Sequence, residues 1–425
     1  MDADFLITNA RLITCAGEAP RIGRRQGVLD AVDDGAVASR DGTIVALGSR
    51  QSVRTTVTLT PDAVTIEADG GTVLPGLVDP HTHAIYAGDR RNELHRRLAG
   101  VSYAEIARQG GGIVATVEAT RTASEEDLIE ATMGRLDEML ACGTTTAEIK
   151  SGYGLDTATE LKMLRAIRRL GQRHVLDLVP TFLGAHEIPI EYRDRRRAYI
   201  ELVTTEMIPA VAADGLAEWC DVFCEEGVYR PDESEEILSA GVAAGLKPRI
   251  HADELAASGG ALLAARLGAR SADHVIFANE TSIPALRSAG VVATLLPVAA
   301  FYLKLGRFAP ARALIDAGVP IALATDVNPG GGFSPSMPFA MTLACFGMGM
   351  TLEESVIAST INAAYAIDRA DAVGSLDVGK RMDAIVLRGP LVDLLRVGAS
   401  PIVAVVKNGR IVSESRGTGA PSASA

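Results

Sequence analysis

Residues 72–83 read TVLPGLVDPHTH, an apolar run that ends in two histidines one residue apart. The run at 72–78 has the length and the continuous apolar character of a strand that is buried on both faces. From here onward the chain repeats one pattern, in which a short apolar run is followed by a polar loop and then by a helical segment. We predict eight strands, at 72–78, 145–149, 176–182, 221–224, 248–251, 271–276, 291–296 and 321–325.

The segments between these strands carry helix signals. Two pairs of residues have the spacing of a capping box and predict helix starts, namely Ser124 with Asp127 and Thr351 with Glu354. A further helix should begin at Asp156 and end at Gly171. Eight strands that alternate with helices over about 300 residues predict an α/β fold, a TIM-like (β/α)8 barrel.

The two ends of the chain do not follow this repeat. Residues 1–70 and 373–412 read as short strands and turns, and Asn408-Gly409 predicts a hairpin. Two such pieces on either side of a barrel at 71–372 can pair with each other. We therefore predict a small β-sandwich domain built from both termini, followed by a disordered tail at 413–425.

Composition excludes several classes of protein. The net charge is −12, so no nucleic-acid partner is expected. The N-terminus is acidic where a signal peptide would be basic, and the longest apolar stretch, 289–303, is too short to cross a membrane. Five cysteines without zinc-finger spacing predict reduced thiols, with Cys220 and Cys224 in the core. We expect a cytoplasmic protein without a membrane partner.

Polar residues at the ends of the predicted strands indicate a metal site, because the active sites of such barrels lie at the carboxyl ends of the strands. Five metal-binding side chains occupy these positions: His81, His83, His251, His274 and Asp326. Alternate residues share one face of a strand, so the first two can grip the same ion. Histidines with a carboxylate suit zinc or iron. The segment 221–226 lacks the lysine that bridges two metals in some barrels, so we expect a single ion.

Three of the polar residues have the chemistry to move protons. Glu254 follows His251 by three positions and is the leading candidate for the general acid and base. Asp253 fits a different role, as a carboxylate at a helix N-terminus. Asp326 could accept a proton from the attacking water, and His274 could orient that water or polarise a carbonyl.

Three further residues predict a substrate that carries a carboxylate. Arg90 lies in the loop after the first strand, where a planar guanidinium can hold a carboxylate by two parallel hydrogen bonds. Tyr153 and His186 follow the second and third strands and can line the same pocket. Together they favour a small anionic substrate whose reactive carbon lies over the metal.

Six stretches resemble the amidohydrolase superfamily and, within it, the imidazolonepropionase family of histidine degradation. They are YAGDRRNEL at 86–94, SYAEIARQGGGI at 102–113, AEIKSGYGLD at 147–156, HADEL at 251–255, ATDVNPG at 324–330 and TINAAYAI at 360–367. The similarity spans residues 4 to 410. The motif DPHTH at 79–83 is shared by many amidohydrolases and carries little information about the substrate.

The resemblance implies a set of roles for residues of this chain. The metal ligands would be His81, His83, His251 and Asp326, holding one divalent or trivalent ion, zinc or iron, in each subunit of a homodimer. Substrate contacts would come from Arg90, Tyr153, His186, Glu254, Asn328, Gly330 and Gly331. The implied reaction is hydrolysis of the cyclic amide C–N bond of 4-imidazolone-5-propanoate to N-formimidoyl-L-glutamate, with Glu254, His274 and Asp326 as catalytic groups.

One departure and two alternatives accompany this resemblance. The segment 328–335 is two residues longer than the usual family pattern and has glycine where serine or threonine is common, at residue 331. A mononuclear deaminase of a nitrogen heterocycle would use the same metal site, and release of ammonia would distinguish it. A barrel that binds metal without catalysis is the other alternative.

Overall fold

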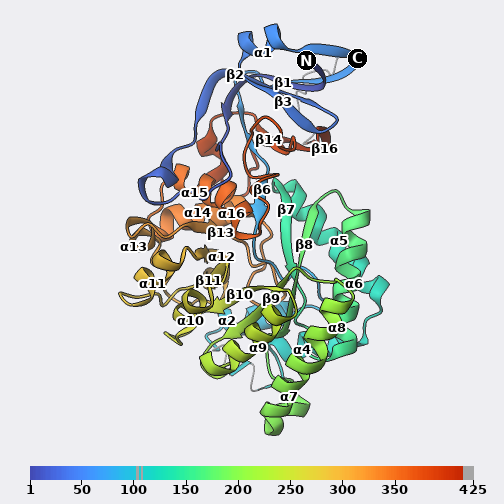
Figure 1. The fold of residues 1–425 in the computed structure, drawn as a ribbon, viewed down its shortest axis with the longest axis vertical. Coiled ribbons are helices and arrows are strands. Elements are labelled where there is room, and N and C mark those ends of the chain that lie inside the picture. The colour runs from blue at the N-terminus through green and yellow to red at the C-terminus, as the bar shows by residue number, and fades with distance from the viewer. Residues whose placement is uncertain (102–104, 107–108, 415–425) are drawn as a thin grey trace.

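The computed structural model describes residues 1–101, 105–106 and 109–414. Figure 1 shows a large α/β part and, above it, a small β-domain built from the first and the last described segments of the chain. The chain passes from the β-domain into the barrel at β6 and returns after α16. The barrel therefore interrupts a domain that the two termini complete.

The large part is a barrel of eight parallel strands. In spatial order they are β6 (Leu77–Asp79), β7 (Thr144–Lys150), β8 (Asp177–Ala185), β9 (Trp219–Cys224), β10 (Lys247–Ala252), β11 (Ser271–His274), β12 (Val292–Leu295) and β13 (Ile321–Leu323). The barrel closes just beyond the first and last strands, where the Asp326 N–H donates to the His81 carbonyl at 3.1 Å and the His83 N–H to the Val327 carbonyl at 3.0 Å. The predicted (β/α)8 fold is confirmed.

Helices surround this barrel on its outer side (Figure 1). Those before β9 are α2 (Arg91–Leu98), α4 (Ile113–Thr122), α5 (Glu125–Ala141), α6 (Thr157–Arg173), α7 (Arg196–Leu202) and α8 (Ile208–Ala213). Those after it are α9 (Pro231–Ala243), α10 (Gly260–Leu267), α11 (Ser282–Ala289), α12 (Pro297–Tyr302), α13 (Ala311–Asp316), α14 (Met337–Met348), α15 (Leu352–Ala358) and α16 (Ile361–Ala366). Within the described part of the chain, none of the helices has the length and apolar character needed to cross a membrane.

The small domain is a second eight-stranded sheet with contributions from both ends of the chain. Its strands are β1 (Asp2–Ile13), β2 (Ala31–Arg40), β3 (Thr43–Ser49), β4 (Thr58–Glu67), β5 (Thr72–Pro75), β14 (Ala384–Leu387), β15 (Ile402–Lys407) and β16 (Arg410–Glu414). Strand β5 joins the two halves, because it pairs with β1 on one side and with β14 on the other. The prediction of a domain built from both termini is confirmed.

The predicted hairpin joins β15 to β16. Asn408 and Gly409 form its two-residue loop with φ of 51° and 69°, the positive pair that a type I′ turn needs. Strand β16 includes Ser413 and Glu414, so these two residues do not belong to the predicted tail. Residues 415–425 lie outside the described part of the chain.

The prediction of one strand at 72–78 was wrong. Residues 72–75 form β5 of the terminal sheet, and residues 77–79 form β6 of the barrel. Gly76 makes the break, since its N–H donates to the Asp383 carbonyl at 2.9 Å and a Cβ there would lie 2.3 Å from Thr145 Oγ1. A run that is apolar throughout does not reveal that its two halves pair with different sheets.

The helix signals were mostly correct. Ser124 accepts from the Asp127 N–H, and Thr351 from the Glu354 N–H, so both capping boxes form. Asp156 caps α6 by accepting from the Thr159 N–H at 2.8 Å. The predicted stop at Gly171 was wrong, because α6 continues to Arg173. A glycine within a helix costs only about 1 kcal/mol, which packing along the rest of the helix outweighs.

All five cysteines are free thiols, as predicted. Cys220 and Cys224 are both buried in β9. Burial raises the pKa of the Cys224 thiol to about 11, so this sulfur stays protonated at neutral pH. These cysteines belong to the core and have no part in the chemistry described below.

Candidate active site

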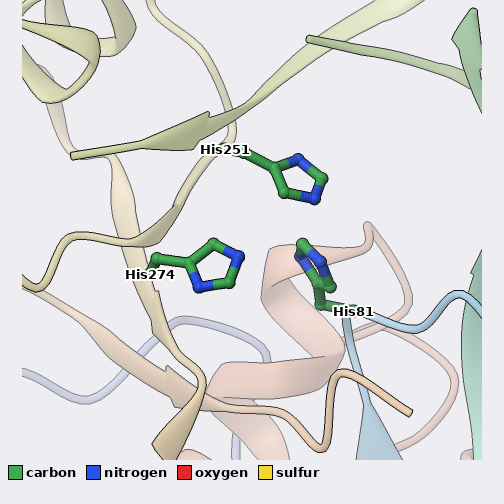
Figure 2. Close-up of side chains that lie close together, drawn as sticks. All are labelled: His81, His251 and His274. Atoms are coloured by element: carbon green, nitrogen blue, oxygen red, sulfur yellow. The ribbon is translucent and has the colours of Figure 1, made fainter. Parts of the chain in front are cut away.

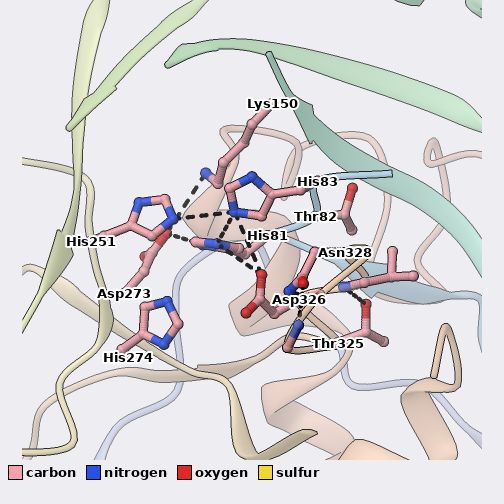
Figure 3. A network of polar contacts seen from close by, with 12 residues as sticks. His81, Thr82, His83, Lys150, His251, Asp273, His274, Thr325, Asp326 and Asn328 are labelled. Atoms are coloured by element: carbon pink, nitrogen blue, oxygen red, sulfur yellow. Dashed lines mark hydrogen bonds and ion pairs between the residues drawn. The ribbon is translucent and has the colours of Figure 1, made fainter. Parts of the chain in front are cut away.

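Three of the predicted metal ligands, His81, His83 and Asp326, place donor atoms within 4.8 Å of one another at the carboxyl end of the barrel, and the fourth, His251, joins them through His83 (Figure 3). His83 Nε2 lies 3.3 Å from the Nε2 atoms of both His81 and His251, and 3.5 Å from Asp326 Oδ1. His81 Nε2 lies 3.6 Å from the same oxygen. Ligands that bind one transition metal at about 2.0–2.2 Å have separations of this size.

The chemistry of these four groups fits a bound cation. Asp273 accepts from His81 Nδ1 at 2.6 Å, so the proton of this ring is on Nδ1 and its Nε2 carries the lone pair. Asp326 Oδ1 is buried and has no hydrogen-bond partner among the described residues. Lone pairs that face one another in a dry site repel unless a positive ion lies between them. The site therefore fits zinc or iron, the metals that imidazole and carboxylate ligands suit.

The protonation states agree with this assignment. Burial lowers the pKa of the His81 and His83 imidazoles well below the usual value, so both rings are neutral. Metal ions bind neutral imidazole, and binding therefore does not have to displace a proton from these two rings. Burial also raises the pKa of Asp326 to about 8 in the metal-free chain. A cation beside the carboxylate favours its ionised form.

His274 lies beside this group of four. Figure 2 shows its ring facing His81 and His251, with ring centroids 5.5 and 5.4 Å away. Its Nδ1 atom lies 3.6 Å from Glu254 Oε1. His274 could thus complete a second ligand group with His81 and His251, or remain beside the ion and orient a water. Its φ of 71° is unusual for a non-glycine residue, and such strain gathers at functional sites.

Most of the predicted site residues line one pocket, which includes three of the four metal ligands; we call His81, His83, His251 and Asp326 the metal-type group. The lining consists of His83, Arg90, Ile113, Tyr153, His186, Phe223, His251, Glu254, Leu255, His274, Leu303, Leu305, Asp326, Asn328 and Gly331. Polar and aliphatic side chains both contribute to it. The apolar members of the lining were not predicted, because a single leucine or isoleucine in a loop has no pattern that separates it from core residues.

Arg90 is held in place on two sides. Its Nη2 donates to Glu93 Oε2 at 2.7 Å, and Glu93 Oε1 accepts from the Gly112 N–H at 2.8 Å. Gly330 packs directly against the guanidinium, where a Cβ would lie 2.3 Å from Arg90 Cζ. Gly330 is not part of the pocket lining, so it makes room for Arg90 instead of forming the wall. The motif at 102–113 borders this region, and its residues 102–104 and 107–108 lie outside the described part of the chain.

Tyr153 is brought into the pocket by a loop that folds around a buried carboxylate. Glu160 of α6 accepts from the N–H groups of Gly152, Gly154 and Leu155 at 2.8 to 3.0 Å. The Tyr153 ring then lies 5.2 Å from the ring of His186, centroid to centroid. Sequence reasoning missed Glu160, although an acid at the start of a helix and next to a glycine-rich loop was a signal.

His186 is a neutral side chain with a defined tautomer. Its Nδ1 lies 3.0 Å from the Gly152 carbonyl, which can only accept, so Nδ1 carries the proton and Nε2 is an acceptor. Burial lowers the pKa of this imidazole to about 3. The ring stacks on His83 at a centroid distance of 4.8 Å. His186 is thus placed to accept an N–H from a ligand above the metal site.

Glu254 lies in a loop that a second buried carboxylate organises. Glu225 Oε2 accepts from the N–H groups of Glu254 and Leu255 at 2.8 and 2.7 Å, and Glu225 Oε1 also accepts from the Ser258 hydroxyl. Burial raises the pKa of Glu254 well above its usual value, and the nearby carboxyl groups of Asp326 and Glu225 raise it further. A carboxyl group with a raised pKa is suited to acid–base work.

Asp253 has the separate role that the sequence predicted. Its Oδ1 accepts from the Gly260 N–H at 2.9 Å and its Oδ2 from the Ala261 N–H at 3.2 Å, at the start of α10. The side chain therefore caps a helix and lies away from the chemistry.

Asn328 lines the pocket, but its amide is used inside its own loop. Its Oδ1 accepts from the N–H groups of Gly330 and Gly331, and its Nδ2 donates to the Asp326 carbonyl at 2.7 Å. The Asn328 N–H also donates to the Gly332 carbonyl at 2.9 Å. Asn328 thus shapes the 328–332 loop, and the substrate contact that the resemblance implies for it stays a prediction.

A layer of buried charges lies next to the metal ligands and was also missed. It contains Glu148 and Lys150 from β7, Asp221 from β9, and Arg249 and Asp273 from neighbouring strands, all completely buried. Asp273 accepts a hydrogen bond from His81 Nδ1 at 2.6 Å, whereas Asp221 Oδ2 lies 3.1 Å from His251 Nδ1 at ion-pair distance. Charged residues inside predicted buried strands were the available signal, because a buried charge needs a partner.

Comparisons with known proteins agree with this geometry. The amidohydrolase family model matches residues 72–413. An imidazolonepropionase from Symbiobacterium thermophilum is 48% identical over 413 residues, covering 96% of this chain and 97% of the relative. Another from Geobacillus kaustophilus is also 48% identical with the same coverage.

Solved structures with lower sequence identity share the fold. A 5-methylcytosine deaminase from Klebsiella pneumoniae has a TM-score of 0.74 at 17% identity, covering 98% of this chain and 99% of the deaminase. A zinc-bound adenosine deaminase from Xanthomonas campestris has a TM-score of 0.70 at 20% identity, covering 96% of this chain and 93% of that protein. Full-length similarity near 48% identity is far closer than either, and the chain belongs to the amidohydrolase family, in the branch of its imidazolonepropionase relatives.

Proposed function

We propose that this chain hydrolyses the cyclic amide C–N bond of 4-imidazolone-5-propanoate and releases N-formimidoyl-L-glutamate. Water supplies a hydroxyl group to the ring carbonyl carbon and a proton to the ring nitrogen as the C–N bond breaks. The observation that carries the proposal is the presence, in one pocket, of a metal-type ligand group together with Arg90, Tyr153 and His186. Relatives that are 48% identical over nearly the whole chain carry the name imidazolonepropionase.

Arg90 would bind the propionate of the substrate. Among the described residues that line the pocket it is the one arginine; its guanidinium donates to Glu93 and packs against Gly330. A planar guanidinium pairs with a carboxylate through two hydrogen bonds, which fixes orientation as well as position. With the propionate at Arg90, the imidazolone ring extends toward His186, whose Nε2 can accept a ring N–H.

Glu254, His274 and Asp326 would handle the protons. Glu254 and His274 lie beside each other over the metal ligands, with 3.6 Å between Oε1 and Nδ1. Glu254 can deliver a proton to the leaving ring nitrogen, because burial raises the pKa of its carboxyl group and so favours the protonated form. Asp326 can receive the proton of the attacking water, and His274 can hydrogen-bond to that water or to the carbonyl oxygen.

His81, His83, His251 and Asp326 would hold one zinc or iron ion. When bound, such an ion supplies Lewis-acid chemistry and lowers the pKa of a coordinated water to about 7. We also propose that the protein works as a homodimer in the cytoplasm, which sedimentation of the purified chain and cell fractionation would test.

A deaminase of a nitrogen heterocycle is the alternative that shares this metal site. The deaminase structures are 17 and 20% identical to the chain, a level that supports the fold alone. A deaminase substrate does not need a carboxylate clamp, whereas Arg90 lies in this pocket. The greater identity of the imidazolonepropionases favours ring hydrolysis.

The first experiment is an assay of zinc-loaded and iron-loaded protein with freshly prepared 4-imidazolone-5-propanoate. Ring absorbance and ammonia should be followed in the same sample. We expect the ring absorbance to disappear without ammonia release and N-formimidoyl-L-glutamate to accumulate. Ammonia released in step with ring loss would indicate the deaminase, and an unchanged ring would refute the proposed substrate.

A further inference from the structure

Lys150 is the last residue of β7, and Figure 3 shows its ammonium group pointing toward the metal ligands, in ion-pair contact with Asp273. It is fully buried, which is rare for lysine unless its charge is paired. Its Nζ donates to Glu148 Oε1 at 2.8 Å, lies 2.8 Å from Asp221 Oδ2 and lies 3.9 Å from Asp273 Oδ2. One ammonium group thus connects three buried carboxylates.

Each of these carboxylates also contacts a metal-binding histidine, either at its ring or at the backbone beside it. Asp221 Oδ2, the oxygen nearest Lys150, lies 3.1 Å from His251 Nδ1, while Asp221 Oδ1 accepts from the His251 backbone N–H at 3.2 Å. Asp273 Oδ2 accepts from His81 Nδ1 at 2.6 Å. Glu148 Oε2 accepts from the N–H of Thr82, the residue between His81 and His83, at 3.1 Å.

We propose that Lys150 is a positioning residue that acts through Asp221, and more weakly through Asp273, to keep the Nε2 lone pairs of His251 and His81 directed at the metal. A carboxylate that accepts from Nδ1 fixes the ring proton on that nitrogen and leaves Nε2 free to bind. Lys150 fixes the carboxylate in turn, since its Nζ lies 2.8 Å from the same Asp221 oxygen that lies near His251 Nδ1. This inference rests on the metal site of the proposed function.

The two histidines should not depend on Lys150 equally. Asp273 has a second cationic partner, because Arg249 Nη2 lies 3.1 Å from its Oδ2. Within the described chain, Asp221 has no lysine or arginine within 4.0 Å except Lys150. Loss of the ammonium group should therefore release the Asp221–His251 pair first and leave the Asp273–His81 pair largely in place.

The test compares Lys150→Met with the wild-type protein, using Zn²⁺ alone as the probe in competition with a chromophoric chelator. We expect the variant to bind Zn²⁺ about 10- to 100-fold more weakly, the usual effect of losing support behind a metal ligand. Lys162→Met is the matched control. Its ammonium donates to the carbonyls of Thr120, Arg121 and Ala123, away from the site, so its Zn²⁺ affinity should be unchanged.

A second measurement separates positioning from a general loss of structure. In protein labelled with ¹⁵N at histidine, the seven imidazoles report which ring nitrogen carries the proton. We expect Lys150→Met to move the proton of His251 from Nδ1 to Nε2 and to leave that of His81 on Nδ1. Weaker Zn²⁺ binding without any change at His251 would overturn the proposal, as would wild-type affinity in the variant.

Should Lys150→Met fail to fold, Lys150→Met with Glu148→Gln takes its place, because it removes one charge of each sign. The double variant leaves Asp221 without its cation, so the same two expectations and the same two refutations apply. A wild-type protein that binds neither Zn²⁺ nor Fe²⁺ would instead refute the proposed metal site, and this inference with it. These measurements do not use the ring-opening assay. Failure of the proposed substrate can therefore be told apart from failure of the role proposed for Lys150.

Discussion

At the scale of single residues, the candidate site depends on side chains whose surroundings have changed their chemistry. His186 is neutral because it is buried, and the Gly152 carbonyl sets its tautomer. Glu254 keeps its proton because it is buried near other acids. These effects turn ordinary residue types into a metal ligand, an acceptor or an acid, and single substitutions can test them.

Arg90→Ala should lower kcat/KM by at least about 30-fold, since a lost charge-assisted carboxylate pair costs about 2 kcal/mol or more. Zn²⁺ binding should be unchanged, because Arg90 is not a metal ligand. Arg91→Ala, at a neighbouring side chain that is 83% exposed, is the matched control and should leave the kinetics unaltered. Equal kcat/KM for Arg90→Ala and wild type would remove the carboxylate clamp from the proposed function.

Glu254→Gln should lower kcat by about 10²- to 10⁴-fold, the usual contribution of a positioned acid or base, because the amide cannot deliver the proton. Zn²⁺ binding should persist, since Glu254 is not one of the proposed ligands. The exposed Glu226→Gln provides a control with the same chemical change. Turnover near the wild-type level in Glu254→Gln would exclude this residue from proton transfer.

At the scale of elements, the site is formed by loops that follow the barrel strands, and buried carboxylates hold these loops through backbone N–H groups. Glu160 organises the loop after β7, and Glu225 the loop after β10. The 328–332 loop uses the Asn328 side chain for the same purpose. Such internal hydrogen bonds allow loops to position side chains almost as firmly as strands do.

The 328–332 loop gives a prediction at this scale. A Cβ at Gly332 would lie 1.8 Å from the Asp326 carbonyl oxygen, so Gly332→Ala must displace either the loop or the metal-type aspartate. We expect a loss of about 1–3 kcal/mol in unfolding free energy and weaker Zn²⁺ binding. Urea unfolding and a chelator competition would measure the two effects.

Gly134→Ala is the control for this substitution. Gly134 lies inside α5, and a Cβ there meets no heavy atom within 4 Å, so alanine should stabilise the chain by about 0.5–1 kcal/mol. If Gly332→Ala were also neutral or stabilising, the close approach of the loop to Asp326 would not be needed in solution.

At the scale of the whole molecule, the terminal domain is fastened to the barrel by a cluster of charges. Asp177, the first residue of β8, accepts from Lys407 Nζ at 2.5 Å and from the Arg381 guanidinium. Lys407 also donates to Asp383 at 2.6 Å. Burial acts to raise the pKa of Asp177, but Lys407 and Arg381 outweigh this effect and hold the pKa below its ordinary value.

This cluster predicts a pH dependence of stability. A carboxyl group with a depressed pKa in the folded state stabilises the protein above its ordinary pKa of 3.8, and this contribution is lost as the pH falls further. Asp177→Asn should therefore cost about 1 kcal/mol of unfolding free energy at pH 7 and at pH 5, since the side chain is 34% exposed. The difference from wild type should shrink below pH 4.

Denaturant unfolding of Asp177→Asn and wild type across this pH range is the measurement. Asp137→Asn is the control, because that exposed aspartate pairs with His174 at 3.2 Å on the barrel surface and away from the β-domain. Its effect should stay within about 0.5 kcal/mol. A difference between Asp177→Asn and wild type that grows toward acid pH would contradict the assigned role of Asp177.

The sequence by itself determined the order of the barrel strands, the capped helix starts and the positions of His81, His83, His251 and Asp326 at strand ends. These features are local: periodicity, capping residues and strand ends can be read along the chain, and parallel barrel topology then brings the strand ends together.

Only the tertiary structure decided the rest. It split 72–78 between two sheets at Gly76 and extended α6 past Gly171. It also showed that the Asn328 side chain forms hydrogen bonds within its own loop. It brought Lys150 next to the metal ligands. These outcomes depend on residues that are distant in the chain, such as Thr145 against Gly76 and Asp221 beside Lys150, and no local pattern records which distant partner a buried group will meet.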